Sequence, residues 1–229
     1  MTTTTGGPGR TTAALTADAV LLDLDSTLVN SLPSLIRSWS QWAEEHALTP
    51  AQVRAALGHG LTAAAIVARL LPPERRAAGL ARVGELETAD VADVTALPGA
   101  KALVAALPPD RWAIVTSGNQ LVARARLRAA GLPEPTVLVT ADDVGRGKPD
   151  PEPYLLGARR VGADPARCLV VEDAPAGLAA ARAAGMRAIG VTTTHPAADL
   201  DADVVVEGLQ NLRVELDGAA LTIVVNGEA

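Results

Sequence analysis

The segment Ala19-Val20-Leu21-Leu22-Asp23-Leu24-Asp25-Ser26-Thr27 decides how the rest of the chain is interpreted. Its four leading apolar residues are typical of a short buried strand, and Asp23 and Asp25 follow where that strand ends. Side chains alternate along a strand, so an extended segment would place both carboxylates on one side. Two carboxylates held that close need a cation or a shared proton. A solvated strand end followed by a turn explains these residues equally well.

Composition limits the classes of protein that this chain can be. Nearly half of its 229 residues are apolar, which allows one large domain or a large and a small one. A net charge of -6 argues against a nucleic-acid binder, which would need a basic face. Cys168 is the single cysteine, so no intrachain disulfide can form, and we expect a reducing, cytoplasmic compartment. No apolar run reaches the roughly 18–20 residues of a membrane helix.

The second half of the chain alternates between predicted strands and helices. Strands are expected at 112–116, 136–139, 168–171, 187–191 and 203–206, and the helices between them end at Gly131, Gly162 and Gly185. Such alternation predicts parallel βαβ units with right-handed crossovers. We therefore expect an α/β fold, a doubly wound Rossmann-like parallel sheet, formed by residues 14–28 and 96–229. The segment 214–225 predicts a hairpin with a type I′ turn at Gly218.

Two segments do not belong to this alternation. Residues 29–95 show helical spacing and no convincing strand, which predicts a helical domain inserted after the first strand. Within it, we expect Trp39 and Trp42 to form core rather than a platform for a ligand. Residues 1–13 are rich in Thr and Gly, and we expect them to form a disordered leader.

Polar residues follow several of the predicted strands at one edge of the sheet. Thr116-Ser117-Gly118-Asn119 follows the second strand of the core, Gly147-Lys148-Pro149 comes after the third, and Glu172-Asp173 ends the fourth. Ligands of open parallel sheets bind at the carboxyl ends of the strands, where Asp23 also lies. Carboxylates that hold Mg²⁺, a lysine and hydrogen-bond donors are what phosphoryl transfer requires. The sequence therefore predicts a phosphate site at this edge.

These residues resemble a known family. Asp-x-Asp-x-Thr from residue 23, Thr-Ser-Gly from 116, Lys-Pro at 148 and Glu-Asp at 172 are similar to the four motifs of the haloacid dehalogenase superfamily. The stretches 112–118, 147–154 and 171–177 resemble its subgroup of sugar, glycerol and 2-deoxyglucose-6-phosphate phosphatases. The resemblance implies magnesium-dependent hydrolysis of small phosphate monoesters, such as sugar or polyol phosphates, through an aspartyl-phosphate. It implies a small phosphorylated metabolite as partner, and residues 29–95 would be a helical cap domain over the substrate. From charge and apolar runs we expect no nucleic acid and no membrane as partner, and we expect a monomer or small homo-oligomer.

The resemblance also implies a role for each matching residue. Asp23 would be the nucleophile, and Asp25 would protonate the leaving group and then activate water. Lys148 would bridge nucleophile and phosphate. The residues that would contact the phosphate or the rest of the substrate are Thr116, Ser117, Gly118, Asn119, His59 and Gly60. The magnesium ligands would be Asp23, Asp173, Glu172 and the backbone carbonyl of Asp25.

The sequence departs from the family pattern in ways that bear on activity. Ser26 stands where the family usually has Gly, and Asn30 where it often has Asp. No Lys occurs between 30 and 95, and Leu35 stands where sugar phosphomutases of the family carry a His. The resemblance therefore favours a phosphatase. Two alternatives stay open, a sugar phosphomutase of the same family and a protein that binds a phosphometabolite without turnover.

Overall fold

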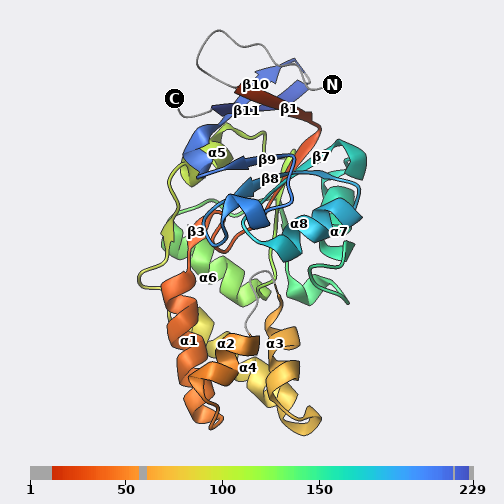
Figure 1. The fold of residues 1–229 in the computed structure, drawn as a ribbon. Helices are drawn as coiled ribbons and strands as arrows, with labels where there is room; N and C mark the ends of the chain where they lie inside the picture. The colour runs from red at the N-terminus through yellow and green to blue at the C-terminus, as the bar shows by residue number, and fades with distance from the viewer. Residues whose placement is uncertain (1–11, 57–60, 219, 227–229) are drawn as a thin grey trace.

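The computed structural model describes residues 12–56, 61–218 and 220–226, and a six-stranded parallel sheet lies at its centre (Figure 1). The strand order is β6-β5-β2-β7-β8-β9, and every neighbouring pair is parallel. The strands are β2 (Ala19–Leu22), β5 (Trp112–Val115), β6 (Val137–Val139), β7 (Cys168–Glu172), β8 (Arg187–Val191) and β9 (Val204–Val206). The apolar run that opened the sequence analysis is thus an inner strand, buried along its whole length.

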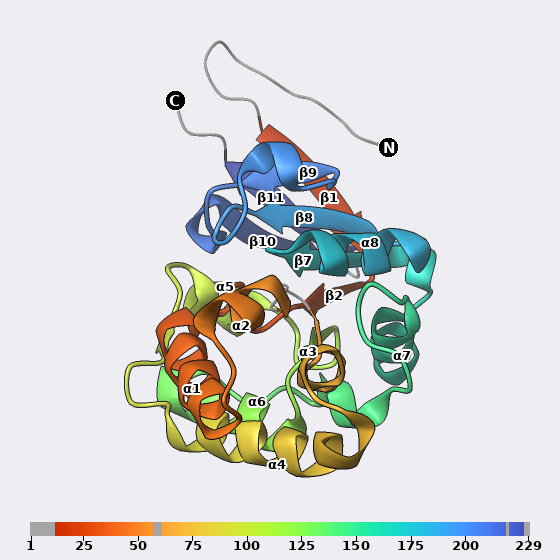
Figure 2. The same cartoon turned by 60° about the horizontal axis from the view of Figure 1, so that its bottom comes forward.

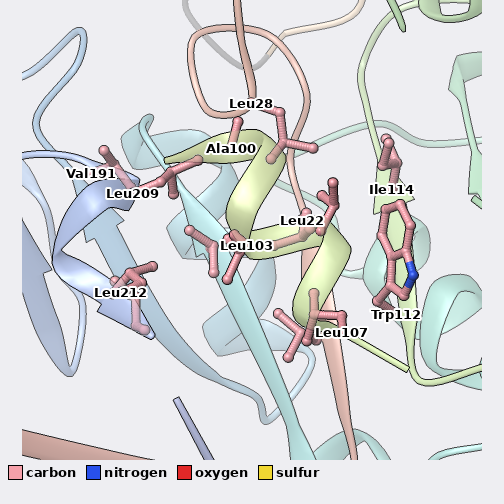
Figure 3. Packing of buried hydrophobic residues seen from close by; sticks show 14 of the residues in the cluster. Leu22, Leu28, Ala100, Leu103, Leu107, Trp112, Ile114, Val191, Leu209 and Leu212 are labelled. Carbon is pink, nitrogen blue, oxygen red and sulfur yellow. The ribbon is translucent and has the colours of Figure 1, made fainter. Parts of the chain in front are cut away.

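Helices cover both faces of this sheet, because the side chains of each strand alternate between them. Val20 and Leu22 pack on the side of α5 (Ala100–Ala106) and α6 (Gln120–Ala130). Figure 3 shows Leu22 beside Leu103 of α5. Ala19 and Leu21 pack on the opposite side, which is covered by α7 (Glu152–Val161) and α8 (Pro175–Ala183). The predicted doubly wound α/β fold is confirmed.

Four helices between residues 32 and 89 form a separate helical body. It consists of α1 (Leu32–Glu45), α2 (Pro50–Ala56), α3 (Ala63–Leu70) and α4 (Pro73–Ala89). These helices share their own apolar cluster, in which Trp39 and Trp42 are 2% and 0% exposed, as expected for core residues. The chain leaves and re-enters the core through two short paired strands, β3 (Val29–Asn30) and β4 (Thr95–Ala96). Figure 2 shows α4 running beside α6 of the core.

A second sheet lies at the end of the molecule opposite these helices (Figure 1). It is antiparallel, with the order β1-β11-β10, and consists of β1 (Thr12–Ala17), β10 (Leu212–Asp217) and β11 (Ala220–Asn226). The predicted hairpin is confirmed, and Gly218 has the positive φ of 56° that a primed turn needs, whereas residue 219 lies outside the described residues.

Strand β1 corrects the sequence analysis, which predicted no strand before residue 19. Thr12 and Ala13, assigned there to the leader, pair with Asn226 and Val225. Its inward positions are occupied largely by alanine, so the alternation was weak in the sequence, and the hydrogen-bonding partner comes from the far end of the chain.

Short 3-10 helices complete the connections, at Ala141–Asp143, Pro165–Arg167, Ala197–Asp199 and Leu209–Asn211. Within the described ranges, no helix combines the length and apolar composition needed to cross a membrane.

Candidate active site

The carboxyl ends of three adjacent strands bring the predicted residues together. Asp23 follows β2 directly, Thr116 follows β5, and Glu172 and Asp173 close β7. Because β2 lies between the other two strands, the three groups share one edge of the sheet. The backbone N–H of Asp23 donates to the carbonyl of Val171 at 3.0 Å, which fixes Asp23 beside the end of β7.

Lys148 reaches this edge from the loop before α7. Its Nζ donates to Asp23 Oδ1 and to Glu172 Oε1, each at 2.7 Å, and it lies 4.9 Å from the centre of the Tyr154 ring. Burial disfavours the ammonium, yet the two carboxylates outweigh this and hold the pKa of Lys148 well above its usual value. Lys148 is therefore a fixed positive charge against the nucleophile predicted from the sequence.

Three carboxylates form a buried acidic cluster around that charge. Asp23, Glu172 and Asp173 each place one oxygen within 4.8 Å of the others. Burial, with the charge of Glu172 adding to it, raises the pKa of Asp23 to about 7 and that of Asp173 to about 8, although Lys148 opposes both shifts. One ammonium does not balance three carboxylates, so the cluster calls for a further cation. Its all-oxygen donor set fits Mg²⁺.

The side chain of Glu172 is already engaged within the protein. Its Oε2 accepts the N–H groups of Asp173 and Ala174 at 2.7 and 2.8 Å, and its Oε1 accepts from Lys148. A Cβ at Gly177 would overlap Oε1, so only glycine leaves room for this orientation. Glu172 thus holds Lys148 in place, and Asp23 and Asp173 are the more available metal ligands.

Asp25 lies apart from the acidic cluster. Ser31 Oγ donates to its Oδ1 at 2.7 Å, Arg126 Nη1 lies 2.8 Å from the same oxygen, and Thr116 Oγ1 lies 3.5 Å from Oδ2. The regular strand β2 ends at Leu22, before both carboxylates. The two have different partners, Lys148 for Asp23 and Ser31 with Arg126 for Asp25.

Ser26 forms a tight turn directly after Asp25. Ser26 has a φ of 66°, a left-handed conformation that costs a residue with a Cβ about 1–2 kcal/mol relative to an ordinary one. Its N–H donates to the carbonyl of Val29 at 2.8 Å, which closes the loop. The glycine that the family usually has at this position would fit without strain.

The loop after β5 is shaped by its own polar groups. The hydroxyl of Thr116, a buried residue, accepts from the N–H of Gly118 at 3.0 Å. Asn119 Oδ1 accepts from the N–H of Val122 at 2.9 Å and thereby caps α6. The side-chain oxygen of Asn119 is therefore occupied in capping α6, while Thr116, Ser117 and Gly118 line the end of β5.

The helical body contacts this site at the segment that carries Lys148. Thr62, the N-cap residue of α3, packs against Gly147, where a Cβ would overlap the Cγ2 methyl group. His59 and Gly60, predicted to contact substrate, lie outside the described residues.

Arg126 and Glu87 are among the residues of the site that the sequence analysis missed. Arg126 is 2% exposed and pairs with Asp25, and Glu87 of α4 lies 3.5 Å from its Nη2. A signal for Arg126 was present, because its spacing of four from Val122 and Ala130 puts it on the apolar stripe of a predicted helix. An arginine on such a stripe needs a buried partner.

Comparisons with known proteins agree with this geometry. A family model described as haloacid dehalogenase-like hydrolase matches residues 17–185. Hexitol phosphatase A of Escherichia coli (strain K12) is 44% identical over 203 residues, covering 85% of this chain and 92% of that protein. Glycerol-1-phosphate phosphohydrolase 2 of Saccharomyces cerevisiae is 32% identical over 218 residues, with 88% and 86% covered. The crystal structure of a hydrolase from Pseudomonas syringae superposes with a TM-score of 0.75 at 27% identity, covering 84% of this chain and 94% of that one.

Proposed function

This chain belongs to the haloacid dehalogenase-like hydrolases, and we propose that it is a magnesium-dependent phosphatase of small sugar or polyol phosphates. The observation that carries the proposal is the buried Lys148 bridge between Asp23 and Glu172, within a cluster of three carboxylates that one ammonium does not balance. The relatives named hexitol phosphatase and glycerol-1-phosphate phosphohydrolase support the substrate class.

Asp23 is the proposed nucleophile. Lys148 holds its Oδ1, so attack on phosphorus proceeds from the other oxygen. A bond forms between Asp23 and phosphorus while the ester P–O bond breaks, and Lys148 offsets the repulsion between the two anions. Asp25 gives its proton to the departing alkoxide. In the second step it takes a proton from water, which attacks the aspartyl-phosphate and releases inorganic phosphate.

The remaining residues of the site bind the phosphate group and the metal ion. Thr116, Ser117 and Gly118 provide donors for the phosphate oxygens at the end of β5. Asp23 and Asp173 would hold Mg²⁺, with Glu172 adjacent and the carbonyl of Asp25 as a further ligand. When bound, the ion supplies positive charge that stabilises the transferring phosphoryl group.

We propose that residues 29–95 act as a cap over this site. Their helices share a core of their own and join the sheet through two short strands. A body attached in this way can close over the substrate and exclude water during the first step. His59 and Gly60, which precede Thr62 in the sequence, are proposed to contact the part of the substrate that differs between one phosphate ester and another.

Hydrolysis of a panel of phosphate esters tests the proposal. Purified protein is assayed for phosphate release from sugar phosphates, polyol phosphates and nucleotides, with magnesium and with EDTA. We expect EDTA-sensitive release from sugar or polyol phosphates, and Asp23→Asn should abolish it while the far-UV circular dichroism spectrum stays unchanged. A preference for nucleotides would overturn the substrate class, and substantial activity of Asp23→Asn would overturn the mechanism.

A further inference from the structure

The carboxylate of Asp25 is anchored by one oxygen only. Ser31 Oγ and Arg126 Nη1 both contact Oδ1, whereas Oδ2 faces Thr116 and Gly118 of the phosphate loop. Ser31 occupies the N-cap position of α1, yet its hydroxyl makes no capping bond and is directed to Asp25 instead. The anchoring therefore leaves Oδ2 on the side of the proposed phosphate-binding loop.

Arg126 connects this anchor to the helical body. It lies in α6 of the core, and its Nη2 is 3.5 Å from Oε1 of Glu87 in α4. Glu87 is itself buried, and its Oε1 accepts from Trp39 Nε1 at 3.1 Å. Burial raises the pKa of Glu87, and the guanidinium opposes that rise. One chain of contacts thus runs from the core of the helical body to the oxygen of Asp25.

A purely structural tie between the two bodies explains this arrangement poorly. Burying an ion pair costs more free energy than burying an apolar contact of the same size. A contact that only holds the two bodies together would therefore not need an arginine. Moreover, Arg126 is incompletely satisfied, because its Nε and Nη2 make no hydrogen bond to the part of the chain that the structure describes. Arg126 does hold Asp25 at a fixed position through Nη1. Its planar guanidinium presents several N–H groups and can contact two carboxylates at once.

We propose that Arg126 is a positioning residue that orients Asp25 for proton transfer to the leaving group, and that Glu87 of α4 keeps Arg126 in place. The inference rests on the proposed function, because it assumes that Asp25 is the proton donor. It makes the orientation of Asp25 dependent on α4 lying beside α6. An open cap would leave Asp25 beside a guanidinium that has lost its second partner, Glu87.

Dependence on the leaving group separates this role from a structural one. A polyol alkoxide must be protonated as it departs, whereas p-nitrophenolate departs without help. The readout is the ratio of kcat/KM for glycerol 1-phosphate to kcat/KM for p-nitrophenyl phosphate, since kcat/KM reports the step in which the ester bond breaks. Arg126→Lys keeps the positive charge but replaces the planar guanidinium, which can contact two carboxylates, with a compact ammonium group. The double variant Arg126→Met with Glu87→Gln removes both buried charges and so avoids leaving one unpaired.

We expect the ratio to fall about tenfold or more in both variants, a part of the ~10²–10⁴-fold that general acid catalysis contributes. Arg128→Gln, at an exposed position of the same helix, should leave the ratio unchanged. Equal losses on the two substrates, or no loss in either folded variant, would overturn the proposal. Failure of the proposed function would look different, because the unmodified protein would then hydrolyse neither ester with magnesium, or Asp25→Asn would show no dependence on the leaving group.

Discussion

Gly147→Ala tests whether contact between the helical body and the core is needed for turnover. The added methyl would overlap Cγ2 of Thr62, and Gly147 does not adopt a left-handed backbone, so alanine meets no other obstacle of conformation. Overpacking of this kind costs about 1–3 kcal/mol. If that cost falls only on the closed arrangement, its population and kcat/KM drop by about 5-fold to 150-fold. The midpoint of thermal unfolding should change little, because the helical body can relieve the overlap by moving.

A second substitution makes the test specific. Thr62→Ser removes only the Cγ2 methyl group and keeps the hydroxyl that caps α3 through the N–H of Ala65. Steady-state hydrolysis of a polyol phosphate is measured for both single variants and for the double variant. We expect the double variant to return to within about twofold of Thr62→Ser, since near-additive effects indicate no contact and a rescue indicates one. A double variant as slow as Gly147→Ala would refute the reasoning, and the cause would then lie in the neighbouring Lys148.

Three further predictions concern the turn, the acidic cluster and the strand end. Ser26→Gly should raise the free energy of unfolding by about 1 kcal/mol or less, measured by urea denaturation, because it removes left-handed strain at some cost in chain entropy. Asp23 and Asp173 have raised pKa values, about 7 and 8, so without metal their ionisation destabilises the fold as pH rises from about 4 to 8. Added Mg²⁺ should therefore raise the unfolding temperature more at pH 8.5 than at pH 5.5. Gly177→Ala should displace the Glu172 carboxylate and lower kcat about tenfold or more, seen in phosphate release.

Each of these has a control or an outcome that contradicts it. Ser40→Gly, at an exposed site inside α1, should instead lose about 0.5 kcal/mol, and a similar loss in Ser26→Gly would show that the turn is not strained. A magnesium shift of equal size at both pH values would contradict the raised pKa values. Ala179→Ser, exposed on α8, should keep full activity, and if Gly177→Ala matches it, Glu172 does not depend on that space.

The sequence predicted the core of this protein well because its signals are local. A run such as Val20 to Leu22 identifies a buried strand without knowledge of its neighbours, and polar residues at strand ends must meet at one edge of a parallel sheet. Lys148 was predicted by its motif, and the structure places it against Asp23. Ser26 was identified as a departure from the family pattern, which usually has glycine there. Its φ of 66° shows why glycine suits the position, since a left-handed backbone favours a residue without a Cβ.

What the sequence did not show depends on contacts between distant segments. Strand β1 has Leu15 as its only large apolar residue and is defined by its pairing with β11. The partners of Asp25, Ser31 and Arg126, come from other segments, so a short apolar run does not reveal them. Glu87 reads as one of several charged residues on a polar helix, and only the packing of α4 beside α6 brings it to Arg126.

The sheet formed by β1, β11 and β10 has a consequence for the order of folding. Thr12 pairs with Asn226 and Ala17 with Leu221, so β1 can acquire its neighbour only after residues 220–226 have been synthesised. Until then Leu15, which packs into the core beside Leu221 and Ile223, has no cover from β11. Closing so long a loop is slow. The nascent chain can therefore assemble the parallel sheet and its acidic cluster first, and the antiparallel sheet forms as the last step, joining the beginning and end of the fold.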